Sequence, residues 1–269
     1  MSHIKKLVVV GDSWTYGSEI RDPLLPSTVN DWDEPNDAYR IPKIWPSKLG
    51  EMMAVDEVIN LSYPAGSNDR SVRSLVGWLT QEYLVPGKDT SELFVVVGLT
   101  SPERKDFFYK DENMNNWITI WPMWSHDYAQ EPLRRFGRLY AEYFWNQEES
   151  THRYINQVFY LQTLFKQYNI KFLFFQAFYQ YKDLHIKQWC DDPYARHYQG
   201  QPDKMIWDMI DNKRFMHKDN GCLSFHNYIT TKDTSTDNNQ SILSMHPSEL
   251  GHTWWAEHMQ EYINEHGLW

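Results

Sequence analysis

Four short apolar segments, separated by helical patterns, constrain the fold of this chain more than any other feature. They cover residues 7–10, 58–61, 93–97 and 171–175. Short unbroken apolar runs are typical of strands buried on both faces, as in a parallel sheet. Apolar residues at helical spacing predict helices over residues 46–54, 69–83, 154–168 and 247–265. Alternating strands and helices predict an α/β fold that binds ligands at the carboxyl ends of its strands.

Local signals refine this outline. Asp69 stands at the start of the second predicted helix, where an acidic side chain is a favourable cap. Two stretches lack clear periodicity: residues 103–149, which are rich in aromatics, and residues 179–244, which are polar. Long stretches of this kind are often lids or binding loops. We therefore expect one domain over residues 1–269, with insertions or lids at about 103–149 and 179–244.

Composition narrows the possible partners. The net charge of -10 argues against nucleic acid or an anionic membrane as the main partner. Cys190 and Cys222 are too few for a disulfide framework, which favours free thiols. The first apolar run is too short for a signal peptide or a membrane span, so we expect a soluble, by default cytoplasmic, protein. The 13 Trp residues pack the interior or offer stacking surfaces for sugars. Nothing in the sequence indicates an oligomeric state.

The first predicted strand runs directly into Gly11-Asp12-Ser13. A serine at a strand-to-helix turn presents its hydroxyl and its own N–H together, and that N–H can face a developing oxyanion. A glycine before it allows a tight turn. The simpler explanation of the same residues is a helix N-cap. His246-Pro247, near the far end of the chain, supplies a matching histidine just before a helix.

These blocks resemble those of the SGNH (GDSL-type) hydrolase superfamily. The glycine block after the second strand matches residues 60–68, with Gly66 and Asn68, and the last block matches His246-Pro247. The third block matches residues 98–101 only in part, with Thr100 in place of the usual Asn. The resemblance implies a three-layer α/β/α sandwich with a parallel, flavodoxin-like sheet. It also implies Ser13 as nucleophile and His246 as base.

The same resemblance implies an oxyanion hole and an orienting acid. The N–H groups of Ser13 and Gly66, with Thr100 or Asn68 as a third donor, are the expected hole. Asp12 is a supporting residue beside the nucleophile. The usual acid lies three residues before the histidine, where this chain has Leu243. A main-chain carbonyl from residues 242–244 then orients His246, giving a Ser-His dyad, or else Asp237 or Asp233 folds back to replace the acid.

Two classes of function follow. The first is an ester hydrolase without a cofactor, acting on a small-molecule or carbohydrate ester, and most plausibly a carbohydrate O-deacetylase or small-acyl esterase. The second is a non-catalytic binding or structural protein on the same scaffold. His246 and His252 have no matching carboxylate or cysteine set, so no metal site is expected. The absence of a G-x-S-x-G segment excludes the other common serine-hydrolase turn.

Overall fold

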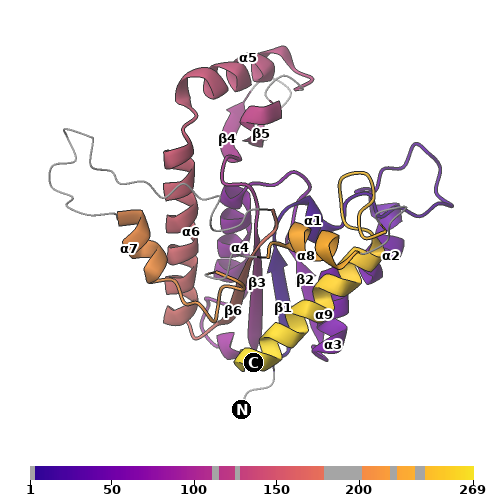
Figure 1. The fold of residues 1–269 in the computed structure, drawn as a ribbon, viewed down its shortest axis with the longest axis vertical. Coiled ribbons are helices and arrows are strands. Elements are labelled where there is room, and N and C mark those ends of the chain that lie inside the picture. The colour runs from indigo at the N-terminus through magenta and orange to yellow at the C-terminus, as the bar shows by residue number, and fades with distance from the viewer. Residues whose placement is uncertain (1–3, 111–114, 125–127, 179–201, 219–222, 234–239) are drawn as a thin grey trace.

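The computed structural model describes residues 4–110, 115–124, 128–178, 202–218, 223–233 and 240–269. Its main sheet has four parallel strands in the order β2-β1-β3-β6 (Figure 1). The strands are β1 (Lys6–Val10), β2 (Glu57–Asn60), β3 (Leu93–Leu99) and β6 (Lys171–Gln176). A separate antiparallel hairpin joins β4 (Lys105–Lys110) to β5 (Asn115–Ile120). All four predicted strands are therefore confirmed.

The four predicted helices are also present, with shifted ends. The helices are α1 (Ser13–Tyr16), α2 (Asp37–Arg40), α3 (Trp45–Met52), α4 (Asn68–Glu82), α5 (Glu131–Leu139), α6 (Gln147–Gln167), α7 (Pro202–Asp208), α8 (Phe225–Lys232) and α9 (Glu249–His266). A π-helical turn, Tyr140–Phe144, follows α5. Helix α6 begins seven residues earlier than its apolar periodicity suggests, because Asn146 caps it through the N–H groups of Glu148 and Glu149.

Side-chain alternation along β1 explains why helices cover both faces of the sheet. Leu7 and Val9 pack into the core beneath α3 and α9, while Val8 and Val10 pack into the core beneath α4 and α6. Successive strand residues point to opposite faces, so a run buried on both sides gives two cores. The α/β/α fold class is confirmed by this arrangement.

The hairpin and α5 project beyond the carboxyl ends of the main strands (Figure 1). They fall in the first predicted insertion, residues 103–149, in which Arg104, Trp121 and Trp124, on either side of the hairpin, border the cavity described below. Of the second, residues 179–244, the described part includes α7 and α8. Residues 179–201, with Cys190, and residues 219–222, with Cys222, lie outside the described residues. Within the described segments, no helix is both long and apolar enough to cross a bilayer.

Candidate active site

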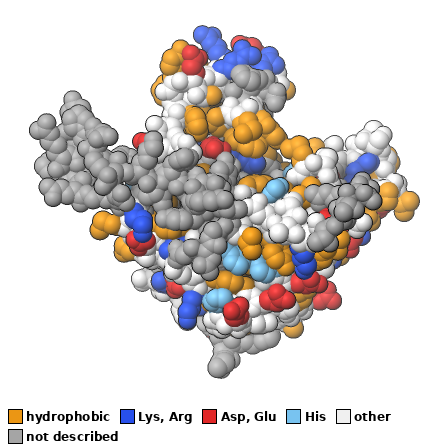
Figure 2. Space-filling view, in the orientation of Figure 1, with side chains coloured by type: hydrophobic (Ala, Val, Ile, Leu, Met, Phe, Trp, Pro, Cys, Tyr) orange, Lys and Arg blue, Asp and Glu red, His pale blue; other side chains and the backbone are white. Residues whose placement is uncertain are grey.

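The two residues predicted as nucleophile and base line one cavity. Ser13 and His246 both border a space of about 910 Å³. Its other walls come from the loop after α1, the turn after β2, the segment after β3 and the residues that follow the hairpin. In Figure 2, hydrophobic side chains gather where the projecting hairpin meets the body of the molecule. The cavity therefore lies at the carboxyl edge of the sheet, where an α/β fold is expected to bind ligands.

Local contacts fix the turn that carries Ser13. Asp12 caps α1, and its Oδ1 accepts a hydrogen bond from the N–H of Trp14 at 3.0 Å. Gly17 ends the helix with a φ of 88°, and its N–H donates to the carbonyl of Ser13. A Cβ on Gly11 would lie 2.4 Å from Thr15 Oγ1, so only glycine fits there. Asp12 is thus the cap, which leaves the Ser13 hydroxyl free of that role.

Neither Oγ nor N–H of Ser13 makes a hydrogen bond to the described part of the chain. The side chain is nearly buried, with 7% of the residue exposed, yet it borders the cavity. A free N–H beside a cavity can serve as an oxyanion contact. The Ser13 hydroxyl makes no hydrogen bond to His246 in this structure, and such contacts are often looser in the absence of a ligand.

The acid that faces His246 is Glu19. Its Oε1 lies 3.3 Å from Nδ1 of His246. The Glu19 carboxylate also accepts hydrogen bonds from the N–H and Oγ of Ser244 and from the N–H of Met245, at 3.0, 2.7 and 3.1 Å. Glu19 thereby holds the loop in front of the histidine as well as the histidine itself.

Glu19 occupies an unusual backbone position. Its φ is 69°, in the left-handed region that non-glycine residues rarely adopt. Its N–H donates to the carboxylate of Asp31, which also lines the cavity. Strained residues persist only where surrounding contacts hold them, and they cluster at functional sites.

Burial alone would raise the pKa of Glu19. The hydrogen bonds from Ser244 and Met245, together with the facing His246, outweigh burial and lower the pKa below its usual value. Glu19 is therefore ionised near neutral pH, as a partner of an imidazolium must be.

Two of the predicted partners of Nδ1, a main-chain carbonyl of residues 242–244 and Asp233, make no hydrogen bond to it, and Glu19 faces it instead. The loop pairs with itself, since Leu243 N–H donates to the His246 carbonyl and Ser248 N–H donates to the Ser241 carbonyl, both at 2.8 Å. Asp233 accepts from the N–H of Ser241 instead, and Asp237 lies outside the described residues. Ser248, not Pro247, marks the start of α9 by capping it.

Two predicted third donors for the oxyanion are already engaged. Thr100 Oγ1 donates to Asp12 Oδ2 at 2.6 Å. The Asn68 amide and the Thr100 main chain exchange two hydrogen bonds, at 3.0 and 2.9 Å. Both side chains are buried, and neither borders the cavity. Asn68 and Thr100 therefore brace Asp12 and the end of β3, and one N–H of the Asn68 amide makes no hydrogen bond within the described residues.

Gly66 also differs from its predicted role as an oxyanion donor. Its N–H donates to the carbonyl of Tyr63 at 3.0 Å and closes a tight turn. Pro64 and Ala65 of that turn border the cavity, whereas Gly66 does not. Of the four predicted donors, only the N–H of Ser13 stands free at the cavity.

Arg104, which sequence reasoning missed, does reach the cavity. Its side chain is 8% exposed, and Nη1 lies 3.3 Å from Asp12 Oδ2 and 3.2 Å from the Gly66 carbonyl. The guanidinium lies 4.4 Å from the ring centre of Trp121, a cation–π contact. No motif marks Arg104, since its contacts are made by residues distant in sequence.

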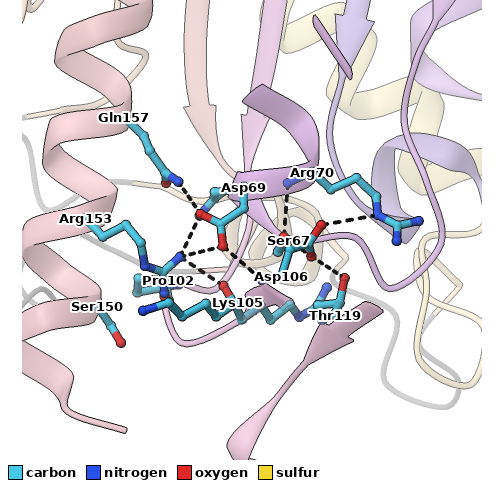
Figure 3. Close-up of polar contacts among 12 residues, drawn as sticks. Ser67, Asp69, Arg70, Pro102, Lys105, Asp106, Thr119, Ser150, Arg153 and Gln157 are labelled. Atoms are coloured by element: carbon cyan, nitrogen blue, oxygen red, sulfur yellow. Dashed lines mark hydrogen bonds and ion pairs between the residues drawn. The ribbon is translucent and has the colours of Figure 1, made fainter. Parts of the chain in front are cut away.

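A polar network holds the chain on either side of Arg104 (Figure 3). Arg153 on α6 donates to the carbonyls of Pro102 and Arg104, at 2.9 and 3.2 Å, and pairs with Asp69 at 3.1 Å. Asp69 also accepts from the main-chain N–H of Asp106. Asp69 was predicted as the cap of α4, but Ser67 is the cap, through the N–H of Arg70. Asp69 instead ties α4 to α6 and to the start of the hairpin.

His252 has a structural role. Its Nδ1 accepts the main-chain N–H of Trp45 at 3.2 Å. Complete burial lowers its pKa to about 3, so the ring is neutral. Within the described ranges, no group of three or more His, Cys, Asp or Glu side chains gathers as a metal site would require.

The chain was compared with solved structures. It is similar to the psychrotrophic esterase EstA from Pseudoalteromonas sp., with 13% identity, a TM-score of 0.44, and 97% of each chain covered. It is also similar to the acetyl xylan esterase AlAXEase, with 13% identity, a TM-score of 0.43, and 96% of this chain and 99% of the other covered.

A GDSL-like lipase from Bacteroides thetaiotaomicron has 11% identity and a TM-score of 0.42, with 97% of this chain and 88% of the other covered. No curated protein matches the chain. A family model matches residues 27–269, nine-tenths of the sequence, and the chain therefore belongs to the family of unknown function DUF6071.

Proposed function

We propose that this protein is a serine ester hydrolase with a Ser13-His246-Glu19 triad. The observation that carries the proposal is the Glu19 carboxylate, 3.3 Å from His246 Nδ1 at the cavity that Ser13 borders. An acid on Nδ1 fixes the tautomer and leaves Nε2 as the nitrogen that serves the serine. It also stabilises the imidazolium that forms when His246 accepts a proton.

In the first step, Ser13 Oγ attacks the acyl carbonyl carbon while its proton passes to His246 Nε2. The carbonyl π electrons move to oxygen, forming a tetrahedral oxyanion that the Ser13 N–H stabilises. The oxyanion collapses, the bond to the alcohol breaks, and His246 returns its proton to the departing oxygen. Water then attacks the acyl-serine in the same way and releases the carboxylic acid. No cofactor enters this sequence.

The cavity lining favours a carbohydrate ester. Four tryptophans border it: Trp14, Trp32, Trp121 and Trp124. Trp32 is 55% exposed and Trp124 is 41% exposed, so both offer ring faces to a ligand. Flat indole faces provide broad apolar contact, and the polar groups of Glu19, Asp31 and Arg21 lie among them. An acetylated sugar combines an apolar ring face with a polar edge and a small acyl group.

Two measurements test this function. Wild-type protein should react with a fluorophosphonate probe and hydrolyse p-nitrophenyl acetate, and Ser13→Ala should do neither. A screen of acetylated sugars should then reveal a substrate that is preferred over the nitrophenyl ester. If the wild-type chain binds acetylated sugars without cleaving them, or Ser13→Ala keeps full activity, the non-catalytic alternative replaces the hydrolase.

A further inference from the structure

The proposed hydrolase lacks a side-chain donor for its oxyanion among the residues that the sequence blocks indicate. Thr100 and Asn68 are engaged with Asp12 and with each other, and Gly66 N–H closes a turn. A single N–H, from Ser13, is a weak hole, because acyl transfer sites commonly use two or three aligned donors. Another group at the cavity must supply the remaining contact.

Arg104 is the charged donor placed against the nucleophile turn. Its Nη1 bonds to Asp12, the residue before Ser13, and to the carbonyl of Gly66. The guanidinium is held between Trp121, at 4.4 Å, and Phe178, at 5.8 Å from the ring centre. A rigid guanidinium presents several N–H groups in known directions.

Arg104 also has unused hydrogen-bonding capacity. Its Nη2 makes no hydrogen bond within the described part of the chain and is not fully buried, so it is the nitrogen that a group in the cavity can reach. Its Nε also has no partner there, but burial closes it off. A guanidinium group has only hydrogen-bond donors and no acceptor. A buried charged group with a free donor beside a cavity is costly unless a ligand or reacting atom completes it. This observation points to a negative charge that appears in the cavity.

We propose that Arg104 is a catalytic residue that donates to the oxyanion, together with the Ser13 N–H. This inference rests on the proposed hydrolase. When Ser13 Oγ bonds to the carbonyl carbon, the electron pair that moves to oxygen is stabilised by the Arg104 guanidinium. When the oxyanion collapses, that pair reforms the carbonyl and the alcohol leaves with the proton from His246. Arg104 keeps all of its protons throughout.

The buried Asp12 carboxylate favours an oxyanion over a permanent anion on the substrate. Asp12 lies 3.3 Å from Arg104 and is 1% exposed, so it balances most of the guanidinium charge in the resting site. A balanced pair attracts a fully charged carboxylate weakly. The pair still stabilises a negative charge that develops within hydrogen-bonding distance of a free N–H of Arg104. This is because the donor is already oriented and needs no reorganisation.

The test compares Arg104→Gln and Arg104→Lys with wild type on the neutral ester p-nitrophenyl acetate. We expect Arg104→Gln to lower kcat by about 10²–10³-fold, the loss typical of one oxyanion donor, with little change in KM. Arg104→Lys keeps the positive charge but loses the planar, forked guanidinium, so its kcat should lie between those of wild type and Arg104→Gln. Guanidinium added to Arg104→Ala should restore part of kcat. Arg135→Gln, an exposed arginine on α5, is the matched control and should behave as wild type.

Three results would overturn the inference. The first is an unchanged kcat in folded Arg104→Gln. The second is a loss confined to KM for esters that carry a carboxylate, which would make Arg104 a substrate anchor. The third result applies if Arg104→Gln does not fold. It is full activity in Arg104→Lys together with no recovery of Arg104→Ala activity on addition of guanidinium. Ser13→Ala, measured in parallel, separates the cases: if it loses activity while Arg104→Gln does not, the hydrolase stands and only the role of Arg104 fails.

Discussion

The turn that carries Ser13 and the segment that carries Arg104 face the same cavity, but they are held in opposite ways. The Ser13 turn takes its shape from residues within four positions of it, namely Gly11, Asp12 and Gly17. The distant Thr100 and Arg104 add bonds to Asp12. The Arg104 segment is held by Arg153 and Asp69, which lie on two different helices. A site can thus combine a nucleophile fixed locally with a charged donor that depends on the whole fold.

His246 falls between these two cases. The loop from Ser241 to Ser248 closes on itself through local hydrogen bonds. The carboxylate that faces the imidazole, Glu19, comes from the opposite end of the chain. The histidine is therefore positioned locally, while its partner is decided by tertiary structure.

The largest expected effect comes from Glu19→Gln. The amide retains an acceptor for Ser244 and Met245, but it removes the negative charge beside His246. We expect kcat on p-nitrophenyl acetate to fall by about 10³–10⁴-fold, near the loss seen when a triad acid becomes an amide. Asp233→Asn is the matched control, since its carboxylate bonds to Ser241 N–H, and it should change kcat by less than about threefold. A large loss in Asp233→Asn with normal rates in Glu19→Gln would reverse the assignment.

Asp69→Asn tests the long-range support of the Arg104 segment. The change weakens the pair with Arg153, which holds the carbonyls of Pro102 and Arg104. Because a displacement of about 1 Å can cost about 10²-fold in rate, we expect kcat to fall by about 10–100-fold. The Tm should drop by only a few degrees, since both side chains are partly exposed. The fluorophosphonate probe should still label Ser13, because the nucleophile turn does not depend on Asp69. Loss of labelling would mean that the two segments are not independent.

The buried His252 makes stability depend on pH. Its folded pKa of about 3 is below the ordinary value of about 6.5, so the unfolded chain binds an extra proton at acid pH. The contribution of His252 to the free energy of unfolding is therefore fully present above about pH 6.5. It falls as the pH drops, and about 3 kcal/mol of it is lost near pH 4. His258, with a pKa lowered by burial to about 4, acts in the same direction. Urea unfolding at pH 7 and pH 5 should show that the free energy of unfolding falls more between these pH values in wild type than in His252→Asn. Equal slopes would contradict a neutral, buried His252.

The smallest effect concerns the hairpin wall of the cavity. Trp124 is 41% exposed, and its ring centre lies 4.6 Å from that of Trp121. Trp124→Ala removes a stacking face without touching Ser13, His246 or Glu19. We expect KM for an acetylated sugar to rise by about 3–10-fold, with kcat for p-nitrophenyl acetate unchanged. A matched change in KM for both substrates would argue against a sugar subsite at this wall.

The sequence by itself determined the framework and the nucleophile turn. Buried runs of β-branched residues fix the parallel strands, and apolar periodicity fixes the helices that cover them. The Gly11-Asp12-Ser13 turn is equally local, because its cap and its glycines lie within a few residues of one another. The position of His246 just before α9 follows from the same short-range logic.

Only the tertiary structure decided which groups complete the site. The contacts of Glu19 with His246 and of Arg104 with Asp12 join residues 227 and 92 positions apart, and no spacing rule encodes such pairs. The donors that looked correct by position, Thr100, Asn68 and Gly66, have their polar atoms satisfied by neighbours that only folding brings near. Most buried polar groups find a hydrogen-bond partner. The partner that a buried polar group finds depends on how the helices and strands are arranged in space, which the local sequence does not specify.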